Sequence, residues 1–261
     1  MKTVLTIAGS DCSGGAGIQG DIKTIAAYGL YSESVITALT AQNTLGVAAV
    51  MQVPPEFLKK QLECVFEDIF PDAVKIGMIP EKAQMQVIEE ILKKYKVKNI
   101  VMDTVMISTS GHHLMDPSAT SYYQKRLLPL ADVMTPNIPE AEWLLKRKIK
   151  TREEKVAAAL DFEVQYNSAI LLKGGHEIED ADDLLVVRGR AIWYQQNRIE
   201  NSNTHGTGCT LSSAVACGLA MGLGIEESVG RAKEYITGAI QEKLNLGKGN
   251  GPLNHMYRIK D

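Results

Sequence analysis

The sequence predicts an α/β protein in which a mostly parallel β-sheet is covered by helices on both faces. Short, nearly continuous apolar segments alternate with helical segments almost throughout the 261 residues, and strands that are apolar on both sides are typical of parallel sheets. Two further strand-like segments flank Arg188-Gly189-Arg190, which predicts an antiparallel hairpin at one edge. The chain has no internal repeat, low-complexity tract or Pro/Gly-rich linker, so we expect one domain over residues 1–261.

The elements can be assigned in chain order from their hydrophobic periodicity. We expect a helix over 55–70, because Leu58, Leu62, Val65 and Ile69 share one helical face. Small and apolar residues make 210–222 a buried helix, and 16–28 is the first helix of the chain. The expected strands are 4–8, 34–40, 48–53, 73–76, 100–102, 133–135, 169–172, 184–187 and 191–194.

Composition narrows the classes of function. Hydrophobic residues make up 45% of the chain, charged residues 23%, and the net charge is −3. These values are ordinary for a globular protein and give no electrostatic reason to expect nucleic acid or an anionic membrane as a partner. No apolar run is long enough for a transmembrane helix, and the N-terminus enters a strand without room for a signal peptide. The four cysteines lack zinc or C-x-x-C spacing, which favours a reducing cytoplasm.

Unusual polar residues follow the predicted strands at the points where the strands end. They include Gly9-Ser10-Asp11, Gln42-Asn43, Gly77-Met78, Asp103 and Lys173-Gly174-Gly175-His176. Because parallel sheets bind ligands at the carboxyl ends of their strands, we expect these residues to border one active site.

The segment Asn203-Thr204-His205-Gly206-Thr207-Gly208-Cys209 is the most informative motif. It opens the predicted buried helix, and its two glycines allow successive backbone N–H groups to point the same way. Unpaired N–H groups and the helix dipole make such a turn an anion site. The dipole would also favour a thiolate at Cys209. An anion site with a base at its edge suits phosphoryl transfer, whereas the structural alternative is a tight turn with an inert cysteine.

Two common nucleotide-binding motifs are not supported. Residues 15–20 fit G-x-G-x-x-G, but the next strand ends in Ala41-Gln42-Asn43 without the acid that would hold a ribose. A nicotinamide-dependent oxidoreductase therefore remains only a distant alternative. No G-x-x-x-x-G-K-[ST] occurs, so the chain is not a P-loop enzyme.

The motif at 203–209 resembles the anion-hole signature of the ribokinase-like superfamily, in the branch of the hydroxymethylpyrimidine and phosphomethylpyrimidine kinases and their pyridoxal kinase relatives. Lys173-Gly174-Gly175-His176, Thr135-Pro136-Asn137-Ile138-Pro139-Glu140 and the loop from Ala8 to Gln19 also resemble that branch, in the same order, and the likeness covers residues 4 to 256. It implies a three-layer α/β/α fold, ATP and Mg²⁺ as co-substrate and cofactor, and a homodimer.

The resemblance also implies roles for individual residues. Catalysis falls to Cys209 as proton acceptor and to the N–H groups of Gly206, Thr207 and Gly208. Asp103 and Glu140 are the metal residues, with Asn137 helping to organise the metal through water. The ATP-side residues are Lys173, Lys233, Asn137, Thr207 and Gly208, and the acceptor-side residues are Gly9, Asp21, Gln42, Met78 and Val105.

The expected reaction is the phosphorylation of 4-amino-5-hydroxymethyl-2-methylpyrimidine, and then of its monophosphate, in thiamine biosynthesis. The carboxamide of Gln42 offers one acceptor and two donors, which complement an aminopyrimidine edge. A pyridoxal kinase is the close alternative. The related pyridoxal kinases carry a second cysteine on a loop over the site, where this chain has Ser108, and this difference favours the aminopyrimidine.

Overall fold

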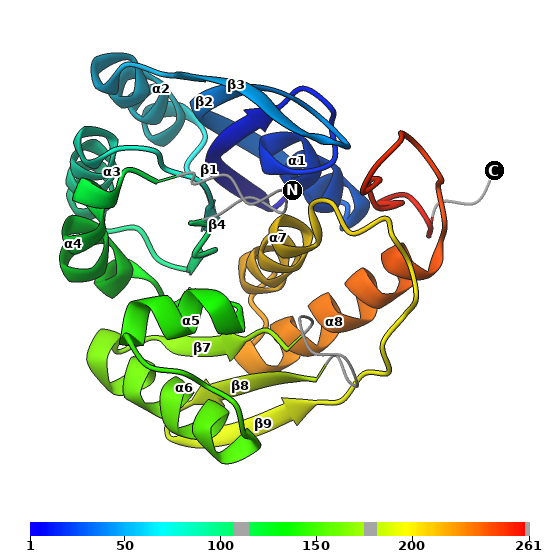
Figure 1. Ribbon diagram of the computed structural model, residues 1–261. Helices are drawn as coiled ribbons and strands as arrows, with labels where there is room; N and C mark the ends of the chain where they lie inside the picture. Colours follow the sequence, from blue (N-terminus) through cyan, green and yellow to red (C-terminus); the bar gives the residue numbers. More distant parts are fainter. Residues whose placement is uncertain (107–114, 175–181, 259–261) are drawn as a thin grey trace.

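The computed structural model describes residues 1–106, 115–174 and 182–258. Within these residues nine strands form one sheet with the order β3-β2-β1-β4-β5-β6-β7-β8-β9, which runs through the middle of the molecule (Figure 1). Their bounds are β1 (Thr3–Asp11), β2 (Tyr31–Asn43), β3 (Gly46–Gln52), β4 (Ala73–Ile76), β5 (Ile100–Met102), β6 (Val133–Met134), β7 (Ala169–Leu172), β8 (Asp183–Val187) and β9 (Arg190–Tyr194).

The centre of the sheet is parallel and both of its edges are antiparallel. Strands β2, β1, β4, β5, β6 and β7 pair in parallel. Strands β8 and β9 form the antiparallel hairpin that the sequence predicts. A second antiparallel pair, β2 with β3, lies at the other edge and was not predicted. The sequence feature that could have predicted this pair is the short connection between Asn43 and Gly46. So short a connection can join antiparallel strands but not parallel ones.

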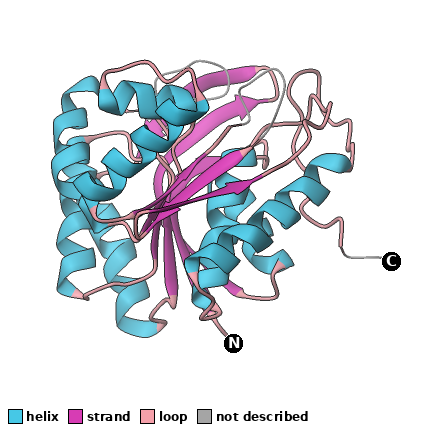
Figure 2. Cartoon of the chain, turned by 90° about the horizontal axis from the view of Figure 1, so that it is seen from below, coloured by secondary structure: helices cyan, strands magenta, loops and turns pink. Residues whose placement is uncertain are grey.

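Helices cover both faces of the sheet and complete the expected three layers (Figure 2). One face carries α1 (Gly17–Ala27), α7 (Thr207–Ala220) and α8 (Ile225–Gln241). The other carries α2 (Pro55–Asp68), α3 (Lys82–Lys94), α4 (Thr120–Tyr122), α5 (Ile138–Leu145), α6 (Arg152–Tyr166) and further short helical turns between residues 117 and 130. No helix in the described ranges is long and apolar enough to cross a membrane.

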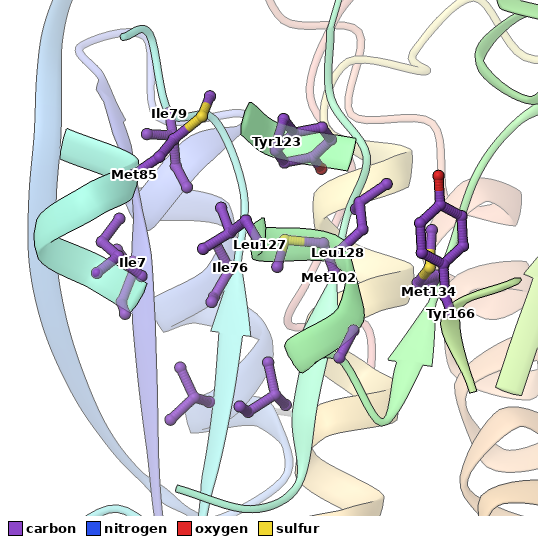
Figure 3. Close-up of a cluster of buried hydrophobic side chains, with 14 of the residues drawn as sticks. Ile7, Ile76, Ile79, Met85, Met102, Tyr123, Leu127, Leu128, Met134 and Tyr166 are labelled. Atoms are coloured by element: carbon purple, nitrogen blue, oxygen red, sulfur yellow. The ribbon is translucent and has the colours of Figure 1, made fainter. Parts of the chain in front are cut away.

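Side chains alternate in direction along the strands, and this divides the core into two apolar clusters, one on each face of the sheet. Val4 packs with α7 and α8, whereas Leu5 and Ile7 pack with α2 and α3, because successive side chains of a strand point to opposite faces. Figure 3 shows part of the cluster that contains Ile7, in which Leu127 lies beside Ile76. The central strands are thus buried on both faces, as parallel strands require.

The expected helix over 55–70 ends earlier than predicted. Helix α2 stops at Asp68, and its buried stripe is Leu58, Leu62 and Phe66. Ile69 lies beyond the helix and is 41% exposed, so the helical period no longer places it toward the core. Phe66 instead stacks on Tyr95 with ring centroids 5.1 Å apart.

Candidate active site

Helix α7 begins where the motif at 203–209 predicts an anion site. Gly206 caps the helix with φ of 86°, and Thr207 is the first helical residue. A Cβ added at Gly206 would lie 1.9 Å from the carbonyl oxygen of Gly15. The turn therefore packs directly against the loop after β1, and only glycine fits this contact in the left-handed conformation.

Asp11, the last residue of β1, organises that loop. Its carboxylate accepts hydrogen bonds from Ser13 N and Oγ at 2.8 and 2.7 Å, and from Ala16 N at 2.8 Å. His205 Nε2 lies 2.8 Å from Asp11 Oδ2. Burial alone would raise the pKa of Asp11, but hydrogen bonds from His205, Ser13 and Gln42 hold it well below its usual range. Asp11 thus ties together the loop, the anion turn and Gln42.

Lys173 and Asp103 meet beside the same turn. Lys173 Nζ lies 3.1 Å from Asp103 Oδ1, and a Cβ added at Gly208 would lie 3.5 Å from that Nζ and 3.6 Å from Asp103 Oδ2. Ser212 and Thr135 also donate hydrogen bonds to Asp103. Burial raises the pKa of Asp103, but the charges of Lys173 and Lys75 outweigh it and lower this pKa overall. The ammonium of Lys173 therefore lies next to the backbone of the turn at Gly208, where α7 begins.

Glu140 and Asn137 form the capping box of α5. Asn137 Oδ1 accepts from Glu140 N at 2.8 Å, and Glu140 Oε2 accepts from Asn137 N at 2.9 Å. Thr104 Oγ1 donates to the same oxygen at 2.9 Å. Burial is the largest cause of the raised pKa of Glu140, and the negative charge of Asp103 adds to it. The Asp103 carboxylate thus lies close enough to Glu140 to disfavour its ionisation.

Cys209 lies in the first turn of α7 but is not the thiolate that the helix position led us to expect. Burial raises its pKa to about 11, with further increases from the charges of Asp21 and Asp103. Lys75 and a backbone hydrogen bond from Gly17 act in the opposite direction without compensating. The helix terminus is therefore too weak to ionise the thiol against its burial, and Cys209 is protonated at neutral pH.

Three acceptor-side residues lie in the strand-end loops. Gly9 contacts Met78, because a Cβ added at Gly9 would lie 3.2 Å from the Met78 sulfur. Gln42, near the end of β2, is partly exposed, and its side chain helps to lower the pKa of Asp11. Val105 is partly exposed in the loop after β5.

Asp21 differs from these three because it has no exposed surface. Its two oxygens accept hydrogen bonds from Thr6, Lys75 and Ser213. A direct contact with the acceptor, expected from the resemblance, does not fit this burial, since no ligand atom can reach the carboxylate while its partners remain in place.

Lys233 projects from α8 toward β8. Its ammonium lies 2.7 Å from Asp183 Oδ2, while Asp183 Oδ1 accepts from Gly174 N at 2.9 Å. Lys233 also borders an open cavity of about 700 Å³, whose wall includes Trp193, Tyr194 and Tyr257. Asp183 therefore links Lys233 to the residue after Lys173.

Sequence reasoning assigned no role to three residues that the structure places at the site: Asp11, His205 and Lys75. Asp11 and His205 lie inside the recognised motifs, so their position was a usable signal. Lys75 lies in an apolar strand, and its ion pair with Asp21 joins residues 54 positions apart. Ser108, Gly175 and His176 lie outside the described residues.

Comparison with known proteins agrees with this geometry. The family model described as phosphomethylpyrimidine kinase matches residues 11–254. The chain is 44% identical to the hydroxymethylpyrimidine/phosphomethylpyrimidine kinase of Rhizobium meliloti, over 97% of both chains. It is 45% identical to the thiamine biosynthesis bifunctional protein ThiED of Geobacter sulfurreducens, over 99% of this chain but only 53% of that protein, so it spans about half of that relative's length.

Solved structures give the same grouping. A phosphomethylpyrimidine kinase from Clostridium difficile 630 superposes with a TM-score of 0.83 at 47% identity, covering 92% of this chain and 100% of that one. The pyridoxal kinase of Bacillus subtilis, solved as an ADP complex, superposes with a TM-score of 0.91 at 33% identity, covering 99% and 98%. With the family model matching nearly the whole chain, this protein belongs to the phosphomethylpyrimidine kinase family.

Proposed function

We propose that this chain transfers the γ-phosphoryl group of ATP to the hydroxymethyl oxygen of 4-amino-5-hydroxymethyl-2-methylpyrimidine, and then a second phosphoryl group to the resulting monophosphate, in thiamine biosynthesis. The observation that carries the proposal is the contact between the anion turn at Gly206–Cys209 and the loop at Asp11–Ala16. This contact supports the proposal, because it brings the first backbone N–H groups of α7 against the loop that we expect to hold the acceptor.

Catalysis of phosphoryl transfer consists mostly of positioning and of neutralising charge on the transferring group. The N–H groups at the start of α7 are fixed before the substrates bind, and one preorganised donor of this kind contributes about 3–4 kcal/mol to transition-state stabilisation. Lys173 adds a positive charge next to Gly208. We assign the γ-phosphoryl group to the space that these groups border.

Asp103 and Glu140 are the residues that would hold Mg²⁺. Burial and the negative charge of Asp103 raise the pKa of Glu140, and a bound divalent cation would favour the ionised form of this carboxyl. Mg²⁺ usually keeps several waters and takes only one or two carboxylates from the protein, so Asp103 and Glu140 would suffice to hold it. When bound, the ion would neutralise charge on the phosphates.

On the nucleotide side we propose Lys233, Asn137 and the cavity between β9 and α8. Lys233 is joined to the Lys173-Gly174 segment through Asp183, which supports a role toward the phosphates. The aromatic wall of the adjoining cavity, with Trp193, Tyr194 and Tyr257, suits the base of a nucleotide.

On the acceptor side we propose Gln42, Gly9, Met78 and Val105. The partly exposed carboxamide of Gln42 offers an acceptor oxygen and an N–H donor to a ligand. An exocyclic amine beside a ring nitrogen complements this pair.

Cys209 is proposed to take the proton of the acceptor hydroxyl. Because its pKa is about 11, only about one molecule in a thousand carries the thiolate near pH 8. The loose transition state of phosphoryl transfer releases the hydroxyl proton late, so the demand on this base is small. The hydroxyl oxygen attacks as its proton moves to the sulfur.

We further propose that the protein acts in the cytoplasm as a homodimer built on the edge at β2 and β3. Leu39 pairs with Met51 and Ala41 with Ala49, so these side chains share one face, and Leu39 and Met51 are 39% and 62% exposed. Association of this apolar face with a second copy would bury it. Sedimentation of wild type against Met51→Glu tests this: an unchanged mass for the variant contradicts the assignment.

The proposed activity is tested by incubating the purified protein with ATP and Mg²⁺ and with one acceptor at a time, following product by mass. We expect a monophosphate and then a diphosphate from the aminopyrimidine alcohol. Pyridoxal kinase activity is the second candidate, favoured by the superposition on the Bacillus subtilis enzyme. Product from pyridoxal alone would replace the first proposal by the second.

A further inference from the structure

An ion pair without any exposed surface lies beneath the site. Lys75, in β4, places its Nζ 2.9 and 2.8 Å from the two carboxylate oxygens of Asp21, in α1, and both side chains are 0% exposed. Thr6 and Ser213 donate to the same carboxylate at 2.6 and 2.7 Å. Burying two charges costs several kcal/mol per ion and stabilises a fold poorly, whereas buried charges are frequent beside catalytic groups.

The pair lies one helical turn from Cys209. Helices α1 and α7 pack against each other, and Ser213 of α7 donates a hydrogen bond to Asp21 of α1. Cys209 is four residues before Ser213, and residues four apart share a helix face. Cys209 therefore lies one helical turn from the contact between Ser213 and Asp21.

The ammonium of Lys75 extends toward the ligand end of the sheet. A Cβ added at Gly77, two residues after Lys75, would lie 2.9 Å from its Nζ. Gly77 immediately precedes Met78 in the acceptor-side loop. Because glycine has no side chain, residue 77 leaves room for the Lys75 ammonium beside it.

Both members of the pair act on Cys209 electrostatically, with opposite signs. Burial raises the pKa of Cys209, the charge of Lys75 lowers it, and the charges of Asp21 and Asp103 raise it. Lys173 also interacts with Cys209. Burial would lower the pKa of Lys75, but Asp21 raises it above its ordinary value, so the ammonium is charged at neutral pH.

We propose that Lys75 and Asp21 are positioning residues that set how readily Cys209 carries negative charge, the ammonium stabilising the thiolate and the carboxylate holding the ammonium in place. The proposal rests on the proposed function of Cys209. In the reaction the thiolate takes the hydroxyl proton as the new O–P bond forms. The bond from the γ-phosphorus to the leaving oxygen breaks, and ADP keeps its electron pair. The thiol then returns its proton to water.

The test is the rate at which iodoacetamide alkylates Cys209 at pH 8 without nucleotide, resolved by peptide mass mapping, with exposed Cys64 as internal standard. Lys75→Met removes the positive charge and should slow alkylation about tenfold, the change that one pKa unit produces. Asp21→Asn removes the negative charge and should speed it by a similar factor. Ser213→Ala keeps both charges and should stay within about twofold of wild type.

Both substitutions in the pair break the same ion pair, so a purely structural role would move the rate in the same direction for both. That result, or no change in either variant, overturns the proposal. If Lys75→Met does not fold, the double variant Lys75→Met/Asp21→Asn leaves no unpaired buried charge and must react more slowly than Asp21→Asn alone. Alkylation needs no phosphoryl transfer, so failure of the proposed kinase activity would be seen separately.

Discussion

Replacing Gly206 by alanine should separate the anion turn from the acceptor loop. The new methyl carbon would lie 1.9 Å from Gly15 O and 2.8 Å from Gly15 C, and Gly206 has φ of 86°. The left-handed conformation costs a non-glycine residue about 1–2 kcal/mol, and forcing atoms into a filled space costs about 1–3 kcal/mol more. We therefore expect Gly206→Ala to lose about 2–5 kcal/mol of unfolding free energy.

Gly222 supplies a matched control at the other end of the same helix. It has φ of 84°, and a Cβ there would meet no atom within 4 Å. Gly222→Ala should cost only the conformational part, about 1–2 kcal/mol, and leave kcat/KM unchanged. Gly206→Ala should in addition lower kcat/KM by about a hundredfold, since a displacement of about 1 Å can cost that much.

Urea denaturation and steady-state kinetics on the two variants decide the matter. The reasoning fails if Gly206→Ala keeps wild-type kcat/KM, or if the two variants lose the same unfolding free energy. Either result would mean that the close contact between the turn and the loop is not needed for catalysis.

Three further predictions concern single side chains. Cys209→Ala should lower kcat about a hundredfold with little change in the KM for ATP. Wild-type activity should rise with pH, because the pKa of Cys209 is about 11, and this rise should vanish in the variant. A near-normal kcat would exclude Cys209 as the base. Gln42→Ala should raise the acceptor KM by a factor equivalent to about 1–3 kcal/mol and leave the ATP KM unchanged, whereas an unaltered acceptor KM would place the pyrimidine elsewhere. Burial, with the charges of Asp68 and Asp72, raises the pKa of Glu33 to about 7 from 4.5. The folded state then holds the proton more tightly than the unfolded state, so stability falls as pH rises from about 4.5 to 7. Glu33→Gln should thus raise the unfolding free energy at pH 8 but not at pH 4.5, and an equal gain at both pH values would refute the titration.

The sequence predicted those features that follow from short segments. The bounds of β4, β5 and β7 agree with the predicted strands. Helix α7 starts at Thr207, inside the glycine turn, and ends at Ala220, so it begins and ends earlier than the predicted helix at 210–222. Strand ends of a parallel sheet meet at one edge, so polar residues after separate strands could be grouped without knowing their distances.

What the sequence could not predict depends on charges and contacts between distant elements. The pKa of Cys209 is set by burial and by the charges of Lys75, Asp21 and Asp103, which lie in different parts of the sequence. The sequence around Cys209 indicated only its position at the start of a helix. The burial of Asp21 likewise depends on Lys75 and Ser213, which no pattern of spacing connects to it.

The preference between acceptors tests the account most directly. Both acceptors, the aminopyrimidine alcohol and pyridoxal, are offered together to the wild-type enzyme with ATP and Mg²⁺, and the ratio of their kcat/KM values is obtained from the two products. The carbonyl oxygen and amide N–H that the partly exposed Gln42 can offer to a ligand predict a ratio of at least about ten in favour of the aminopyrimidine, equivalent to about 1.4 kcal/mol in transition-state binding. An equal or reversed ratio would contradict the proposed acceptor and make the chain a pyridoxal kinase.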